Sequence, residues 1–62
     1  MNVKLLRIKN ELTQKELAKK VGVSHVTIGK VEKGLIDEVH FGTLKKIAAA
    51  LNSSFEELFL SE

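Results

Sequence analysis

The sequence predicts an all-α fold of five helices in a single domain that spans residues 1–62. Apolar residues recur three and four positions apart along most of the chain, which is the spacing of a helix face. No segment shows the alternation of a strand, and the 62 residues contain no proline to interrupt a helix. With 44% apolar residues, such a chain lies near the lower size at which one core is self-supporting.

The first two helices are predicted by an apolar row and by a capping sequence. The first is expected over residues 2–10, where Val3 and Leu6 share a row. The second begins with TQKE, in which the Thr13 hydroxyl accepts a helix N–H and the Glu16 carboxylate accepts the N–H of Thr13. Gly22 follows its last apolar residue, at a position that favours a left-handed backbone.

Three more helices are expected after this glycine. Ser24 caps the third, which ends at Lys33 and Gly34. A loop over residues 35–40 leads to the fourth, which opens at His40 or Gly42. Its apolar face contains Leu44, Ile47, Ala48 and Leu51. A second capping box, SFEE from residue 54, opens a short fifth helix that carries Leu58 and Phe59.

Charge is distributed unevenly along the chain. Residues 1–33 hold eight basic against three acidic side chains, whereas residues 34–62 hold two basic against five acidic ones. A basic half of this kind is typical of a surface that binds a polyanion, and it is equally compatible with ordinary solvated lysines. The charge pattern alone leaves both interpretations open.

Several classes of protein are excluded by what the sequence lacks. There is no cysteine for a disulfide or thiolate site, no apolar run of the ~20 residues that a membrane span needs, and no secretion signal at the N-terminus. A cytoplasmic protein is therefore expected. No serine or threonine has a base at a recognisable spacing, so we expect no enzyme. Asp37, Glu38 and His40 could form a metal cluster only on paper, because a flexible loop provides no preformed geometry, and no metal or cofactor is expected.

The short connection around Gly22 makes the second and third helices cross steeply, so the third helix projects from the domain. Val23, Ile28 and Val31 are expected to bury its inner side. The outer side carries small or hydrogen-bond-donating residues and no carboxylate, a composition that the major groove of DNA can admit. These outer residues are His25, Val26, Thr27, Gly29, Lys30 and Lys33.

The segment LTQKELAKKVGVSHVTIGKVEKG, residues 12–34, resembles the helix-turn-helix of the phage Cro and lambda-type repressors, the XRE family. The resemblance extends over essentially the whole chain and includes LKKIAAALN and SFEELF. It implies a lambda-repressor-like domain in which the second and third helices form the helix-turn-helix. It also implies an ion pair between Arg7 and Glu32 that links the first helix to the third.

The resemblance further assigns the DNA contacts by position. His25, Val26, Thr27 and Lys30 are expected to read bases, and Gln14, Ser24 and Lys33 to contact phosphates. His25 could instead be a solvated residue of the first turn, and Val26 simply an exposed valine. Both alternatives stay open.

The expected function is that of a sequence-specific repressor of bacterial or phage type, without a small-molecule ligand domain. One short recognition helix buries little surface, so we expect a homodimer on a palindromic operator of double-stranded DNA. The apolar residues Leu58, Phe59 and Leu60 are the expected dimer contact. The alternative is a helical protein-interaction module, such as an antitoxin or the partner of a regulator, which would use the same apolar end.

Overall fold

The computed structural model describes residues 3–60, which form four α-helices and one turn of π-helix and contain no strand. The elements are α1 (Val3–Lys9), α2 (Gln14–Val21), α3 (His25–Glu32), α4 (Phe41–Ala50) and the π-turn η1 (Glu56–Leu60). The expected first residue of helix one, Asn2, lies outside the described residues. No helix of the described part is long and apolar enough to cross a membrane.

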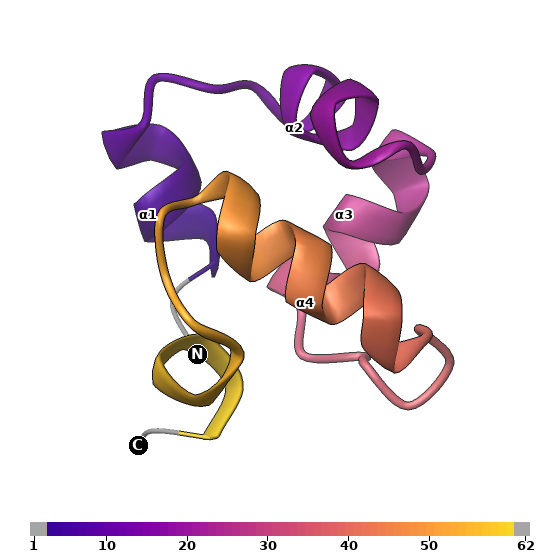
Figure 1. Ribbon diagram of the computed structural model, residues 1–62. Coiled ribbons are helices and arrows are strands. Elements are labelled where there is room, and N and C mark those ends of the chain that lie inside the picture. The colour runs from indigo at the N-terminus through magenta and orange to yellow at the C-terminus, as the bar shows by residue number, and fades with distance from the viewer. Residues whose placement is uncertain (1–2, 61–62) are drawn as a thin grey trace.

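The core lies between α4 and the helices α1, α2 and α3 (Figure 1). Leu17 of α2, Ile28 of α3 and Ile47 of α4 are fully buried, and Val3 of α1 and Leu58 of η1 are nearly so. Every element thus contributes apolar surface to one cluster. Since α2 packs on both α3 and α4, it links the α2–α3 pair to the rest of the core.

All four α-helices end in the same way. A residue with a positive φ lies one position after α2 and two positions after α1, α3 and α4. The N–H of the residue that follows it donates to a carbonyl five positions earlier, which satisfies a free carbonyl of the last turn. Gly22 and Gly34, with φ of 88° and 84°, adopt the left-handed conformation that the sequence predicts. The other two positions are occupied by Glu11 and Asn52, each with φ of 58°. The four hydrogen bonds are Leu12 to Arg7 (3.1 Å), Val23 to Ala18 (3.0 Å), Leu35 to Lys30 (2.9 Å) and Ser53 to Ala48 (2.9 Å).

The last element differs from an ordinary α-helix. Its capping box forms as predicted, because the N–H of Glu57 donates to Ser54 Oγ at 3.0 Å and the N–H of Ser54 donates to Glu57 Oε1 at 3.4 Å. Residues 56–60, which include Glu57 of the box, nevertheless adopt the wider π geometry. So short a helix has little stability of its own, and the packing of Leu58 and Phe59 against the core decides its form.

Candidate nucleic-acid interface

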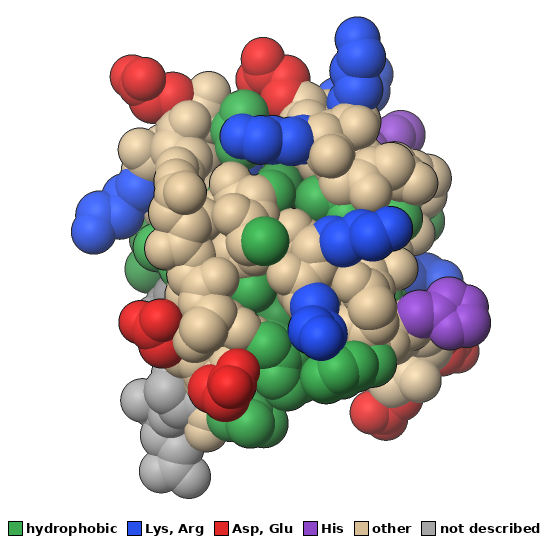
Figure 2. All heavy atoms as spheres, in the orientation of Figure 1, with side chains coloured by type: hydrophobic (Ala, Val, Ile, Leu, Met, Phe, Trp, Pro, Cys, Tyr) green, Lys and Arg blue, Asp and Glu red, His purple; other side chains and the backbone are tan. Residues whose placement is uncertain are grey.

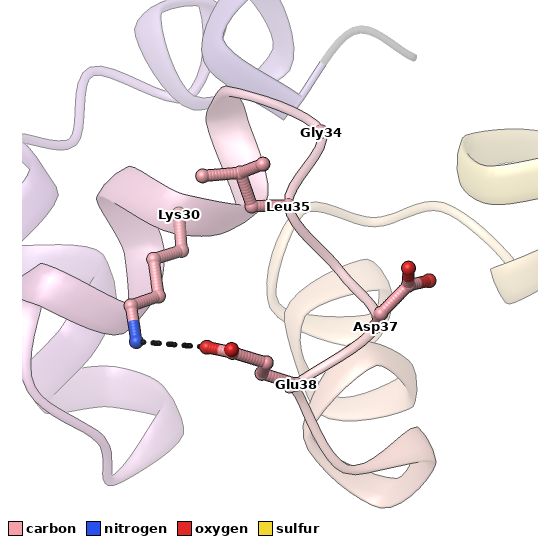
Figure 3. A pocket seen from close by; sticks show the side chains of 5 residues that line it. All are labelled: Lys30, Gly34, Leu35, Asp37 and Glu38. Atoms are coloured by element: carbon pink, nitrogen blue, oxygen red, sulfur yellow. Dashed lines mark hydrogen bonds and ion pairs between the residues drawn. The ribbon is translucent and has the colours of Figure 1, made fainter.

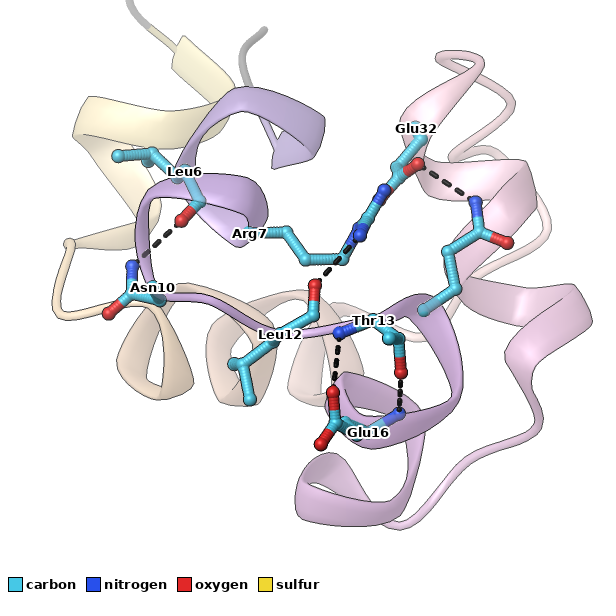
Figure 4. Close-up of polar contacts among 8 residues, drawn as sticks. Leu6, Arg7, Asn10, Leu12, Thr13, Glu16 and Glu32 are labelled. Carbon is cyan, nitrogen blue, oxygen red and sulfur yellow. Dashed lines mark hydrogen bonds and ion pairs between the residues drawn. The ribbon is translucent and has the colours of Figure 1, made fainter.

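The start of α2 is fixed by the predicted capping box (Figure 4). The N–H of Glu16 donates to Thr13 Oγ1 at 3.0 Å, and the N–H of Thr13 donates to Glu16 Oε1 at 2.8 Å. The backbone hydrogen bond from Thr13 is the main reason that the pKa of Glu16 lies below its ordinary value, and the Thr13 side chain adds to this effect. The backbone at the N-terminus of α2 is therefore well defined.

The turn between α2 and α3 sets the direction of the second helix. After Gly22, Ser24 has an extended backbone and its Oγ accepts the N–H of Thr27 at 3.3 Å. The hydroxyls of Ser24 and Thr27 also lie 3.3 Å apart. Ser24 thus serves as the N-cap of α3, and Thr27 is half-buried beside it.

The outer side of α3 carries most of the residues expected to read bases. Ile28 and Val31 face the core with no exposed surface, whereas His25 and Lys30 are exposed and Val26 is 57% exposed. Val23, which was expected to be buried, is only half-buried. No carboxylate lies among the exposed residues of α3, so this side can approach a polyanion.

Lys30 has a contact that the sequence pattern does not predict. Its Nζ lies 3.4 Å from Glu38 Oε2 in the loop between α3 and α4 (Figure 3). Both side chains are solvent-exposed. Since the two residues are eight positions apart and joined by an irregular loop, no helical spacing could have indicated the pair.

Arg7 and Glu32 form the ion pair that the family resemblance implies, and it joins α1 to α3 (Figure 4). Arg7 also donates through Nη1 to the carbonyl of Leu12 at 2.8 Å. The Nε2 of Gln14 donates to the other carboxylate oxygen, Glu32 Oε1, at 2.9 Å. Gln14, expected to contact a phosphate, is therefore held in place by the ion pair, a link that its position in the motif did not reveal.

The ionisation of Glu32 reflects this network. Burial raises its pKa, but the hydrogen bonds from Arg7 and Gln14 and the positive charges of Arg7 and Lys4 outweigh burial, and the pKa lies below its ordinary value. Glu32 therefore stays ionised at neutral pH and keeps both neighbouring side chains oriented.

A surface hollow of about 330 Å³ lies beside this network, and Lys4, Gln14, Gly29, Glu32 and Lys33 line it. It combines two ammonium groups with a carboxamide, a set of donors that suits a phosphate. The sequence pattern did not single out Lys4. The available clue was its spacing, because Lys4 lies three residues before Arg7 and so on the same side of α1.

The three residues expected at a dimer contact differ in exposure. Leu58 is only 2% exposed and belongs to the core, so in this conformation it is not available to a partner. Leu58 is buried because η1 packs against the core through this side chain. Phe59 is half-buried, and Leu60 is 66% exposed.

A small aromatic cluster adjoins this end of the chain. The rings of Phe41 and Phe55 have centroids 4.6 Å apart, and those of Phe55 and Phe59 have centroids 5.3 Å apart. Phe41, at the start of α4, is 58% exposed. Figure 2 shows hydrophobic side chains gathered at the lower edge of the face that α4 presents. We call Phe41, Phe59 and Leu60 the apolar patch, because the rings of Phe41 and Phe59 both lie against Phe55 and Leu60 is the residue after Phe59. Phe41 was not anticipated, because Phe55, the ring that it contacts, is distant in the sequence.

Among residues 3–60, no three metal-ligating side chains come together in a way that could hold a metal ion. His40 is the N-cap residue of α4 but makes no side-chain capping hydrogen bond. The loop residues Asp37, Glu38 and His40 therefore do not form a metal site in the described structure.

Comparison with known proteins agrees with this geometry. A family model described as helix-turn-helix matches residues 3–58. An uncharacterized HTH-type transcriptional regulator of Methanocaldococcus jannaschii is 41% identical over 63 residues, which cover 97% of this chain and 89% of the relative. Two uncharacterized HTH-type transcriptional regulators of Archaeoglobus fulgidus are each 41% identical, over 94% of this chain and 81% and 80% of their own lengths.

Proposed function

Because the chain belongs to the helix-turn-helix family, we propose that it is a sequence-specific DNA-binding repressor that inserts α3 into the major groove. The observation that carries the proposal is the composition of α3. Its inner side is fully buried at Ile28 and Val31, and its exposed side presents donors and an apolar methyl surface without a carboxylate. A helix that is rigidly packed on one side and free on the other can enter a groove about 12 Å wide.

Four residues of α3 read bases in this proposal. His25 donates a ring N–H to a purine acceptor, Val26 contacts a thymine methyl, and Lys30 donates to guanine. Thr27 is half-buried against the N-cap, so its hydroxyl reaches only a base or phosphate close to the helix start. His25, Val26 and Lys30 are exposed without any rearrangement of the core.

Phosphates bind on both sides of α3. Gln14 lies in the hollow with Lys33, and one hydrogen of its carboxamide remains for a phosphate when the other is donated to Glu32. Lys4 adds a second positive charge to the same hollow. Ser24 lies at the N-terminus of α3, and its hydroxyl can donate to a phosphate while its lone pair accepts the N–H of Thr27. Such contacts determine the register on the duplex and supply affinity that depends on salt.

The protein binds its operator as a twofold dimer through the apolar patch. Phe41 and Leu60 are 58% and 66% exposed, so residues 3–60 leave much of their apolar surface uncovered. A symmetric contact buries the same patch on both subunits, and two recognition helices about 34 Å apart then read a palindrome. Occupancy of the operator excludes RNA polymerase and so represses transcription.

Selection of bound DNA from a random duplex pool tests the proposal. We expect an imperfect palindrome with two half-sites about one helical turn apart. The Lys30→Ala variant should lose preference at one base pair of each half-site, whereas Lys46→Ala, an exposed lysine of α4, should retain the full preference. Enrichment of no sequence by the parent chain would refute sequence-specific binding.

The apolar patch also favours the second candidate, a helical module that binds another protein. In that case a partner helix, rather than a second copy, covers Phe41 and Leu60. The two candidates differ in the selection experiment, because a pure protein-interaction module enriches no DNA sequence.

A further inference from the structure

We propose that Glu38 is a specificity-determining residue, and that Lys30 and Glu38 act together to read a single G·C base pair. The inference rests on the proposed function, because it requires α3 to lie in the major groove. Its starting point is the ion pair between Lys30 Nζ and Glu38 Oε2, with side chains that are 45% and 79% exposed. Figure 3 shows the two side chains pointing toward each other. Both residues line an open hollow of about 230 Å³.

The pair has little reason to exist for the sake of the fold. An exposed lysine–carboxylate pair contributes only about 0–1 kcal/mol to stability, since water screens the charges and two long side chains lose freedom. A carboxylate beside the groove-facing lysine also repels phosphates, so it weakens contacts with the DNA backbone. Binding free energy that offsets this repulsion must come from contacts with the base edges.

The two charged groups match the edge of a G·C pair. In the major groove, guanine presents the acceptors O6 and N7, and cytosine presents the N4 amino donor. O6 and N4 are themselves hydrogen-bonded and so lie about 2.9 Å apart. An ammonium and a carboxylate oxygen 3.4 Å apart can therefore face the two atoms together. Lys30 has three hydrogens, so after its contact with Glu38 two remain for guanine O6 and N7.

The same geometry ranks the other base pairs. With thymine on the Lys30 side, O4 accepts one hydrogen, but the C5 methyl replaces the second acceptor and meets a charged ammonium. With cytosine or adenine on that side, an amino group faces the ammonium where guanine has O6, and an acceptor faces the carboxylate of Glu38; adenine N7 can still accept from Lys30. The expected order is G·C first, T·A second, and A·T and C·G last. An ionised carboxylate only accepts, so it penalises the reversed pairs strongly.

The test compares Glu38→Gln with Asp37→Asn on the selected operator. Both variants remove one negative charge from the same exposed loop, but the Asp37 side chain points away from Lys30 (Figure 3). A glutamine can donate as well as accept, so Glu38→Gln removes the penalty for the reversed pair. The position that Lys30 reads is identified first, as the base pair at which Lys30→Met loses preference. The affinity of each variant is then measured for four operators that differ only at this base pair, all at one salt concentration.

We expect the parent chain and Asp37→Asn to prefer G·C over C·G by about tenfold or more, and Glu38→Gln by less than about threefold. Both charge removals should raise affinity for unrelated DNA to a similar extent. In the Lys30→Met background, Glu38→Gln should cause no further loss of preference at this base pair. A preference in Glu38→Gln equal to that of the parent, or a preferred pair other than G·C at this position, would overturn the inference. Failure of the parent to select any operator would instead refute the proposed function.

Discussion

Nε of Arg7 lies 2.6 Å from Oε2 of Glu32, and this contact joins the first helix to the recognition helix in a nearly dry site, where the two side chains are only 11% and 6% exposed. The second carboxylate oxygen accepts from Gln14, and the second Arg7 donor reaches the carbonyl of Leu12. The network leaves none of its buried polar atoms without a partner in the described structure. A complete buried network is sensitive to the loss of any one member, because the remaining charge cannot return to water.

Arg7→Met should therefore destabilise the domain by about 3 kcal/mol, since it leaves the carboxylate of Glu32 buried without its counter-charge. The double variant Arg7→Met, Glu32→Leu should recover much of this loss. Urea unfolding followed by circular dichroism measures both. Lys30→Met, which breaks the exposed pair with Glu38, is the control and should cost less than about 1 kcal/mol. A double variant less stable than Arg7→Met alone would contradict this account.

The stability of the domain should fall at acidic pH because of the same carboxylate. The pKa of Glu32 is lower in the folded state than its ordinary value of 4.5, so the unfolded chain binds the proton more tightly. Its contribution is then complete above about pH 4.5 and is lost as the pH falls through the folded-state pKa. Urea midpoints from about pH 2 to 6 should show this loss.

The double variant Arg7→Met, Glu32→Leu is the control for the acid effect and should show a shallower dependence on pH. Some dependence remains, because the pKa of Glu16 is also lowered by its hydrogen bonds with Thr13. Equal slopes in the parent and the double variant would show that Glu32 does not titrate as described.

Two glycines offer a matched test of the turn. A Cβ added at Gly22 or at Gly29 would meet no atom within 4 Å, so space does not distinguish the two positions. Gly22 has φ of 88°, where an L-residue is strained, whereas Gly29 lies inside α3. Gly22→Ala should destabilise by about 1 kcal/mol, and Gly29→Ala should stabilise by up to about 1 kcal/mol. Thermal melts that shift in the same direction would argue against a turn fixed by backbone conformation.

The end of α1 contains a non-glycine residue in the left-handed conformation. Glu11 has φ of 58° and an exposed side chain, so Glu11→Gly should relieve strain and stabilise the domain by about 0.5–1 kcal/mol. Asn52→Gly is the control, since asparagine tolerates the same φ of 58° and should gain less. A loss of stability in Glu11→Gly would contradict this account. It would mean that the glutamate side chain adds more to the free energy of unfolding than its backbone strain takes away.

The sequence predicts helix starts and glycine ends well because the decisive interactions are local. The hydroxyl of Thr13 and the carboxylate of Glu16 are three residues apart, and a glycine such as Gly22 or Gly34 adopts a positive φ without the steric cost that other residues pay. Glu11 was not foreseen as a helix end, because a residue forced into the left-handed region by the chain around it has no signature of its own.

Contacts between distant residues were predictable only where the family resemblance supplied them. Arg7 and Glu32 are 25 positions apart and were expected from the matched motif. The contact of Lys30 with Glu38 depends on the path of an irregular loop, and the contact of Phe41 with Phe55 depends on the path of the chain after α4. Periodicity gives neither path. The base-reading and phosphate-binding roles themselves remain predictions.

The apolar patch provides the last prediction, that Leu60→Asp weakens self-association and operator binding together. Leu60 is 66% exposed and can be changed without disturbing the core, whereas Phe59 packs partly against it and Leu58 lies within it. In a symmetric contact the new aspartate is present on both subunits, so two carboxylates are buried and repel each other. The dimerisation affinity should therefore fall at least tenfold. Leu35→Asp, at a residue that is 59% exposed in the loop after α3, is the control for self-association and should leave the dimer intact. Sedimentation equilibrium measures the dimer, and titration of a labelled operator measures binding. A parent chain that stays monomeric at tens of micromolar both free and on its operator, or equal dimerisation of the parent and Leu60→Asp, would rule out this patch as the dimer contact.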